Sequence, residues 1–192
     1  MSGDDLSTLS VRALLDELAS ESPAPAGGSA AGVTVAMAAA LVEMGARRSA
    51  SWEDAMGVAA QARSLRLRTV PLVQADAEAY AASLAALASI EDAPGSDRDE
   101  AIASALEGAA DVALAIARAG TDAAYLAELV ADRGEPSGRD DAQAAVVLAE
   151  AGTRVAAALV AANLMTAEGD DRGSAAASCA RTAAMVRSRV AE

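Results

Sequence analysis

The chain has 192 residues, a length that suits one well-filled hydrophobic core, so a single domain spanning residues 1–192 is expected. Its formal net charge of −13 repels phosphate backbones and no basic stripe offsets it, so nucleic acid is not expected as a partner. The sequence has no histidine and one cysteine, Cys179, which excludes an intramolecular disulfide and the nitrogen ligands of common zinc sites, so no metal site is predicted.

The apolar part of the composition predicts helices. Hydrophobic residues make up 53% of the chain but aromatic residues only 2%, so Ala, Leu and Val supply most of the apolar surface. Alanine has the highest helix propensity, and runs of β-branched and aromatic residues are scarce. We therefore expect an all-α protein, an up-and-down multihelical bundle.

The N-terminus and one apolar segment bear on location. Residues 1–6 are acidic and polar and lack the basic start and apolar run of a signal peptide, so a cytoplasmic location is expected. Residues 29–46 contain Glu43 as their only charge and are long enough to suggest a membrane span. Their alanine and glycine content, and the lack of a second comparable span, favour a buried central helix instead, and no membrane partner is expected.

In chain order, the first predicted helix is short and amphipathic. A loop rich in proline and glycine follows it at 23–28, and Ser29 is positioned to cap the N-terminus of the apolar helix. A third, long helix begins after Ser51 and contains Pro71, which is expected to kink it. The apolar face of the first helix consists of Val11, Leu14, Leu15 and Leu18.

Glycine and proline also divide the second half of the chain. Pro94 and Gly95 mark a turn at 92–96, and Gly120 is expected to interrupt the helix that follows it. Loops are expected at 135–138 and 168–173. Helices are thus predicted over residues 7–19, 29–46, 51–90, 97–119, 121–134 and 139–165, and from the turn at 168–173 to near the C-terminus.

The first candidate for chemistry is the segment Pro25–Ser29, a glycine-containing loop that leads into a helix N-terminus. Free backbone amides at such a position bind a carboxylate, a phosphate or a carbonyl oxygen. A pair of glycines before a helix also fits a simple tight turn, and the pattern alone leaves both interpretations open.

Three further positions place polar side chains in helical segments. Asp76 and Tyr80 share one helix face at i and i+4, although a solvated carboxylate fits the same pattern. Asp140 and Asp141 open a helix, where acidic residues also act as partners of the helix dipole. Asn163 lies in an apolar run, so its amide must bond either backbone or ligand.

These elements, in this order and spacing, resemble the cyclodeaminase/cyclohydrolase family, which includes formimidoyltetrahydrofolate cyclodeaminase and methenyltetrahydrofolate cyclohydrolase. The likeness spans nearly the whole chain. The glycine loop is similar to the family's Pro-Gly-Gly-Gly-Ser motif, and the segment around Asp76 to its Asp-x-Asp-Ala-x-Ala-Tyr motif. The segments that carry the resemblance are Leu14–Ala19, Pro25–Ser29, Ala40–Met44, Gln74–Tyr80, Asp140–Ala142, Leu148–Ala151 and Leu159–Leu164.

The resemblance implies a helical bundle with a buried central helix, a homodimer, and a folate one-carbon enzyme with no cofactor beyond its tetrahydrofolate substrate. The acidic residue regarded as the family's proton shuttle falls on Asp76. The residues expected to bind the substrate are Gly27, Gly28, Ser29, Tyr80, Asp141 and Asn163, with Arg47 among the arginines that could hold the anionic glutamate tail.

Four departures from the family pattern support a second hypothesis. They lie at Ala26, Gln74, Asp140 and Leu159, and each removes a polar or conformational element. The alternative is a non-catalytic relative that binds a different small molecule or partner. Between the two enzymatic activities, cyclohydrolase is favoured, because the 192 residues contain no formiminotransferase domain. The true substrate stays open at this point.

Overall fold

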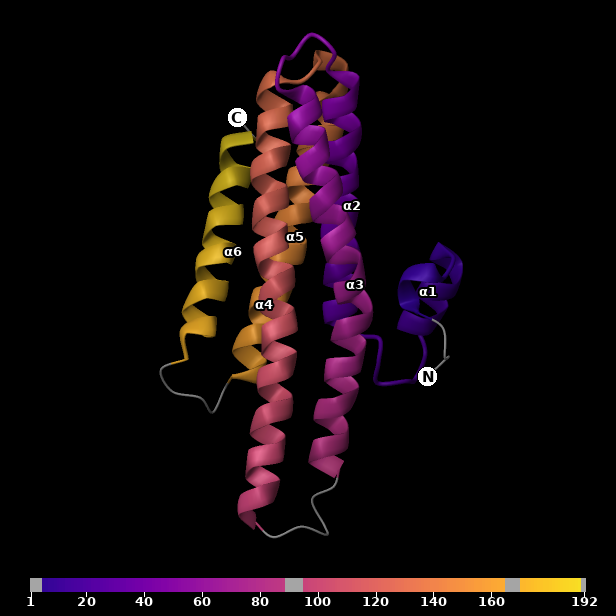
Figure 1. The fold of residues 1–192 in the computed structure, drawn as a ribbon, viewed down its shortest axis with the longest axis vertical. Coiled ribbons are helices and arrows are strands. Elements are labelled where there is room, and N and C mark those ends of the chain that lie inside the picture. The colour runs from indigo at the N-terminus through magenta and orange to yellow at the C-terminus, as the bar shows by residue number, and fades with distance from the viewer. Residues whose placement is uncertain (1–4, 89–94, 165–169, 191–192) are drawn as a thin grey trace.

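The computed structural model describes residues 5–88, 95–164 and 170–190, with side chains from residue 99 onward in the second range. This part of the chain contains helices and no strand, which confirms the all-α prediction (Figure 1). The predicted ends at Ile90 and Met165, and most of the turn at 92–96, lie outside the described residues. The elements are η1 (Leu6–Thr8), α1 (Val11–Leu18), α2 (Gly27–Arg48), α3 (Ala55–Ala88), α4 (Gly95–Arg133), η3 (Pro136–Gly138), α5 (Arg139–Asn163) and α6 (Asp171–Val190).

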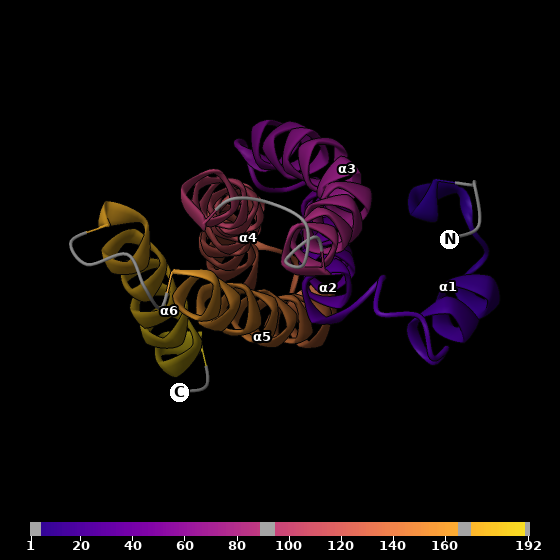
Figure 2. The same cartoon turned by 90° about the horizontal axis from the view of Figure 1, so that it is seen from below.

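Four long helices form an up-and-down bundle, with α6 packed along α4 and α5 (Figure 1). The N-terminal segment lies apart: Figure 2 shows α1 projecting to one side of the bundle. The preceding turn of helix η1 is fixed to α3, because the backbone N–H of Leu6 donates to Oε1 of Gln74 at 3.1 Å. Within the predicted apolar face of α1, Val11 and Leu15 are exposed, at 76% and 57%, whereas Leu14 and Leu18 are partly buried.

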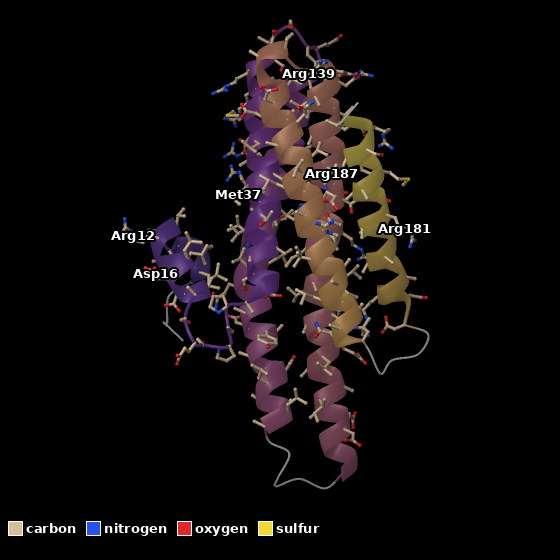
Figure 3. The ribbon with its side chains drawn as sticks, turned by 180° about the vertical axis from the view of Figure 1, so that it is seen from behind. Arg12, Asp16, Met37, Arg139, Arg181 and Arg187 are labelled. Atoms are coloured by element: carbon tan, nitrogen blue, oxygen red, sulfur yellow. The ribbon has the colours of Figure 1, made fainter. Side chains whose placement is uncertain are left out.

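Helix α2 is the central element that the sequence predicts, since it packs against α3, α4 and α5. Small residues make this packing close. A side chain at Gly32 would press on Val73 of α3, and one at Gly45 would press on Val130 of α4. Helix α2 is not enclosed on every side, however, because its fourth side is exposed around Met37 (Figure 3).

Several predicted helix starts and one predicted break differ from the structure, and the helix predicted from residue 51 begins at Ala55 as α3. Helix α1 begins at Val11, capped by Ser10, and α2 begins at Gly27 instead of Ser29. Ser29 is therefore no N-cap, and its hydroxyl bonds to α3 instead. Gly120 does not interrupt a helix: α4 continues through it, because the glycine provides room for Thr153 of α5. Pro71 lies within α3, which continues past it.

The expectation that no second apolar span exists was wrong. Both Gly27–Arg48 and Pro136–Asn163 are long and apolar enough to cross a membrane, with mean hydropathies of 1.5 and 1.6. In the bundle these two helices lie against each other, and 56% and 44% of their most apolar windows are buried inside the protein. The high apolarity of α5 thus has a structural explanation, because it packs on α2, α4 and α6.

Candidate functional site

The start of α2 and the middle of α3 meet at a buried carboxylate. The Oγ of Ser29 lies 3.0 Å from Oδ2 of Asp76 and 3.0 Å from the carbonyl oxygen of Val73. Both Ser29 and Asp76 are buried, at 0% and 9% exposure. A hydroxyl has one proton and two lone pairs, so Ser29 can donate to either oxygen. Asp76 thus lies inside the protein, in contact with the predicted glycine segment.

Gly28 allows this close approach. A Cβ atom at position 28 would overlap the carboxylate of Asp76, whereas a Cβ atom at Gly27 would meet nothing within 4 Å. The Asp76 carboxylate therefore lies directly against the first turn of α2. The free backbone N–H groups and the positive end of the helix dipole are located there.

The environment of Asp76 changes its acidity. Burial raises the pKa of the Asp76 carboxyl, while hydrogen bonds from the side chain and backbone of Ser29 lower it, and burial has the larger effect. The net pKa is above the ordinary value. A carboxylate with these properties can accept a proton more readily than one in water, and it can stabilise a neighbouring cation.

A small apolar cluster includes the residues of α3 on either side of Asp76. Val73 and Ala77, which flank Asp76 in α3, belong to a small buried cluster with Leu6 and Ala24, against which Leu9, Leu14 and Val33 pack. Gln74, which replaces an acidic residue of the family motif, lies in the same turn of α3. Its amide oxygen accepts from Leu6 and its Nε2 donates to Oε1 of Glu78 at 2.9 Å. Gln74 therefore fixes the N-terminal segment to α3 two residues before Asp76, a role that sequence reasoning missed.

Two other predicted residues lie at the same end of the bundle. Tyr80 follows Asp76 by one turn of α3 and is 39% exposed. Asn163 is the last residue of α5 and is half-buried, and its side chain makes no hydrogen bond to the described residues. Gly152 of α5 packs beside Ala31, near the start of α2. Asn163 follows Gly152 by eleven residues, about 16 Å of helix, and therefore lies at the end of the bundle where α2 begins.

Asp141 and Arg47 lie at the opposite end, so the structure does not bring all the predicted residues into one pocket of a single chain. Asp141 is near the start of α5, where its carboxylate is 3.9 Å from Arg48 at the end of α2. Gly28 and Arg48 are separated by twenty residues of α2, about 30 Å of helix. Helices α2 and α5 run antiparallel, so the end of α2, with Arg47, lies beside the start of α5, with Asp141. Both are far from Asp76, which lies beside the start of α2.

The end of α2 contains a second buried carboxylate. Glu43 is 8% exposed and accepts from Nε and Nη2 of Arg66 at 3.2 and 2.9 Å, while Nη2 of Arg47 lies 2.7 Å from it. Hydrogen bonding from Arg66 holds the pKa of Glu43 below its ordinary value. The single charge in the apolar helix was the sequence signal for this ion-pair network. Across the described residues, no group of three acidic or thiol side chains could hold a metal ion.

The protein is thus an all-helical bundle in which a carboxylate of α3, Asp76, is buried against the first turn of the central helix α2. The chain belongs to the formiminotransferase-cyclodeaminase family, whose model matches residues 10–183. Among curated proteins, it is 37% identical over 156 residues to a methenyltetrahydrofolate cyclohydrolase from Methylorubrum extorquens, covering 77% of this chain and 75% of that protein.

A solved structure shares the fold. The crystal structure of a formiminotetrahydrofolate cyclodeaminase from Thermotoga maritima superposes with a TM-score of 0.78 and covers 96% of this chain and 98% of that one, at 23% identity. The family resemblance drawn from the motifs and the predicted helical fold are both confirmed.

Proposed function

We propose that this protein is a folate one-carbon enzyme that hydrolyses 5,10-methenyltetrahydrofolate to formyltetrahydrofolate, with Asp76 as its proton carrier. The observation that carries the proposal is the buried Asp76 carboxylate against Gly28 and Ser29. The 37% identity to a methenyltetrahydrofolate cyclohydrolase supports this substrate.

Asp76 would act in two steps. The methenyl carbon belongs to a cationic amidinium, which the anionic carboxylate stabilises. As water attacks this carbon, Asp76 accepts one of its protons and a carbon–oxygen bond forms. One carbon–nitrogen bond then breaks, Asp76 returns the proton to the leaving nitrogen, and the hydroxyl proton is released to solvent as the formyl C=O forms.

The same carboxylate serves the related cyclodeaminase activity, which the family match brings into consideration. There the formimino group of 5-formimidoyltetrahydrofolate reacts as its protonated amidinium. The N10 nitrogen attacks the formimino carbon, Asp76 moves the N10 proton to the formimino nitrogen, and the bond from carbon to this nitrogen breaks to release ammonia and leave the methenyl cation. The two activities differ in the nucleophile and in the leaving group, while the proton carrier is shared.

Substrate binding would involve the same end of the bundle. The backbone amides of Gly27 and Gly28 are available to orient the pterin by hydrogen bonds, while the backbone N–H of Ser29 is already bonded to Asp76. The side-chain amide of Asn163 has no hydrogen-bond partner among the described residues and is available as well. Tyr80, exposed one turn beyond Asp76, offers an aromatic face. The chemistry requires no cofactor besides the folate.

The decay of methenyltetrahydrofolate absorbance in the presence of purified protein tests the function. We expect the wild type to exceed the buffer rate, and Asp76→Asn to lose roughly a hundredfold to ten-thousandfold of that activity. Glu78→Gln is the matched control, because it neutralises an exposed carboxylate two residues away and should keep the activity. A wild-type rate equal to that of buffer, with tight folate binding by calorimetry, would instead favour the non-catalytic alternative.

We further propose that the protein is a homodimer formed through one apolar surface, the α2–α5 face. Helices α2 and α5 lie side by side there, and Met37 projects from it (Figure 3). None of its residues is charged, and the one hydroxyl, of Thr34, bonds to the carbonyl of Ala30 at 2.8 Å. The face consists of Ala30, Val33, Thr34, Met37, Leu41, Met44, Ala144, Val147, Ala151, Val155 and Ala158.

We propose a second copy of the chain as the partner of this face. Exposed apolar surface of this kind marks an interaction site, and a face without charge can pair with itself across a two-fold axis. The opposite sides of α2 and α5 are already buried in the bundle. Analytical ultracentrifugation should give a dimer for the wild type and a monomer for Met37→Glu. Met185→Glu on α6 is the control, since Met185 is 53% exposed against 47% for Met37. A monomeric wild type, or equal dissociation of both variants, would contradict the proposed interface.

A further inference from the structure

A cleft of about 450 Å³ lies between the end of α2 and the first half of α3. Three arginines line it, Arg47 from α2 and Arg63 and Arg68 from α3. Two exposed apolar side chains also line it, Met56 at 67% and Leu67 at 55% exposure, and the remaining lining residues are Ala59, Ala60 and Ser64. The cleft thus combines several cationic groups with apolar surface.

The arginines of the cleft outnumber their acidic partners. Glu43 is bonded to Arg47 and Arg66 at the base of this region. Neither Arg63 nor Arg68 forms an ion pair with a carboxylate in the part of the chain that the structure describes, so their guanidinium groups keep free donors. Arg63 and Arg68 thus add two guanidinium groups to the Glu43–Arg47–Arg66 cluster without a carboxylate of their own within ion-pair distance among the described residues, in a chain whose net charge is −13.

Glu43 also organises the cleft. Arg66 is held by two hydrogen bonds to Glu43, and Arg47 by a close ion pair at i and i+4. Fixing Arg47 in this way reduces the side-chain entropy that a ligand would otherwise have to offset. One acidic residue, Asp122, lies on the far side of Arg68, where it lines a neighbouring cleft of about 400 Å³ together with Ser64 and Tyr125.

We propose that this cleft binds a small polyanion through its carboxylate or phosphate oxygens, with Arg47, Arg63 and Arg68 as donors. Planar guanidinium groups bind such oxygens in bidentate geometry, and a cluster of them in an acidic protein concentrates anions locally. The proposal is independent of the Asp76 chemistry, because Arg63 precedes Asp76 on α3 by thirteen residues, about 20 Å of helix.

Two sources of such an anion can be separated by titration calorimetry on the full-length protein at low ionic strength. Citrate and pyrophosphate represent free metabolite anions, and a γ-linked triglutamate represents the tail of the proposed folate substrate. Binding of any one of the three supports the site and identifies the preferred source. Binding should weaken steeply as salt is added, since exposed charges are screened within about 10 Å at 0.1 M salt.

The double variant Arg63→Ala/Arg68→Ala locates the binding. We expect it to weaken the affinity on the order of a hundredfold, because each lost charged hydrogen bond costs roughly tenfold or more. The control is Arg12→Ala/Arg181→Ala, which changes the net charge equally at two exposed arginines outside the cleft. Thermal unfolding should show all three proteins folded, since every substituted side chain is exposed.

Three results would overturn the proposal. The first is no detectable binding of citrate, pyrophosphate or triglutamate by the wild type at low salt. The second is unchanged binding in the Arg63→Ala/Arg68→Ala variant. The third is equal weakening in the Arg12→Ala/Arg181→Ala control, because that result would reflect overall charge rather than a site.

Discussion

Gly28 and Asp76 are complementary: the absence of a side chain on the first leaves the space that the carboxylate of the second occupies. The contact joins residues that are 48 positions apart, on two different helices. It also explains why a glycine occurs at position 28 in the first turn of α2, where helix propensity alone would favour another residue.

Substituting the two glycines separately tests this relationship. Gly28→Ala should displace Asp76, destabilise the protein by about 1–3 kcal/mol, and reduce activity on the order of a hundredfold. Gly27→Ala has free space around it and should change stability by less than about 1 kcal/mol, towards greater stability. Urea unfolding and the methenyltetrahydrofolate assay measure both effects. Similar behaviour of the two variants would show that the contact is unimportant.

The raised pKa of Asp76 predicts a specific pH dependence of stability. Because the folded-state pKa lies above the unfolded value of about 3.9, the unfolded chain releases this proton first as pH rises. The wild type therefore loses stability from about pH 4 up to the folded-state pKa, and Asp76→Asn lacks this loss. Urea unfolding of both proteins between pH 4 and 7 should show the variant gaining relative stability with pH. A constant difference would contradict the raised pKa.

The opposite sign is expected at Glu43. Its pKa is lowered, so its contribution is present above the ordinary glutamate pKa of about 4.3 and is lost as pH falls further. Glu43→Gln should cost about 1–2 kcal/mol at pH 7, a modest value because Arg47 and Arg66 are partly exposed. The difference from wild type should shrink below pH 4.3. Glu53→Gln, at an exposed residue without an ion pair in the described structure, should show neither effect.

Much of the fold could be predicted because the helical signals are local. Alanine content, the apolar residues 29–46 and the glycine and proline turns depend on neighbours in sequence, and they located α2, α3, α5 and α6. The prediction that Gly120 interrupts a helix was wrong for the same reason. Its role depends on Thr153, which is distant in sequence, and no local signal distinguishes a glycine that ends a helix from one that packs against another helix.

The candidate site was only partly predictable. The motifs that resemble the family indicated Gly28, Ser29 and Asp76, and these residues do lie together. The same motifs indicated Asp141, which lies about 30 Å away along the bundle. A motif records which residues occur in a family but not which end of an antiparallel helix they occupy. The contact between Leu6 and Gln74 had no sequence signal of its own.

Two glycines of α4, Gly120 and Gly108, differ in the space around them. A Cβ atom at position 120 would overlap Oγ1 of Thr153 and lie 3.2 Å from the carbonyl oxygen of Ala149, whereas position 108 has nothing within 4 Å. Thr153 is fully buried and its hydroxyl donates to Ala149 at 2.7 Å, so it has little room to move.

Gly120→Ala should therefore destabilise the protein by about 1–3 kcal/mol, although alanine is the better helix former. Gly108→Ala should stabilise it by up to about 1 kcal/mol, the propensity difference without a packing cost. In a chain of this length, 1 kcal/mol corresponds to roughly 2–4 °C in Tm, so a thermal scan separates the two. An increase in Tm for both would mean that α4 and α5 can move apart at this point, and that the glycine is not needed for their packing.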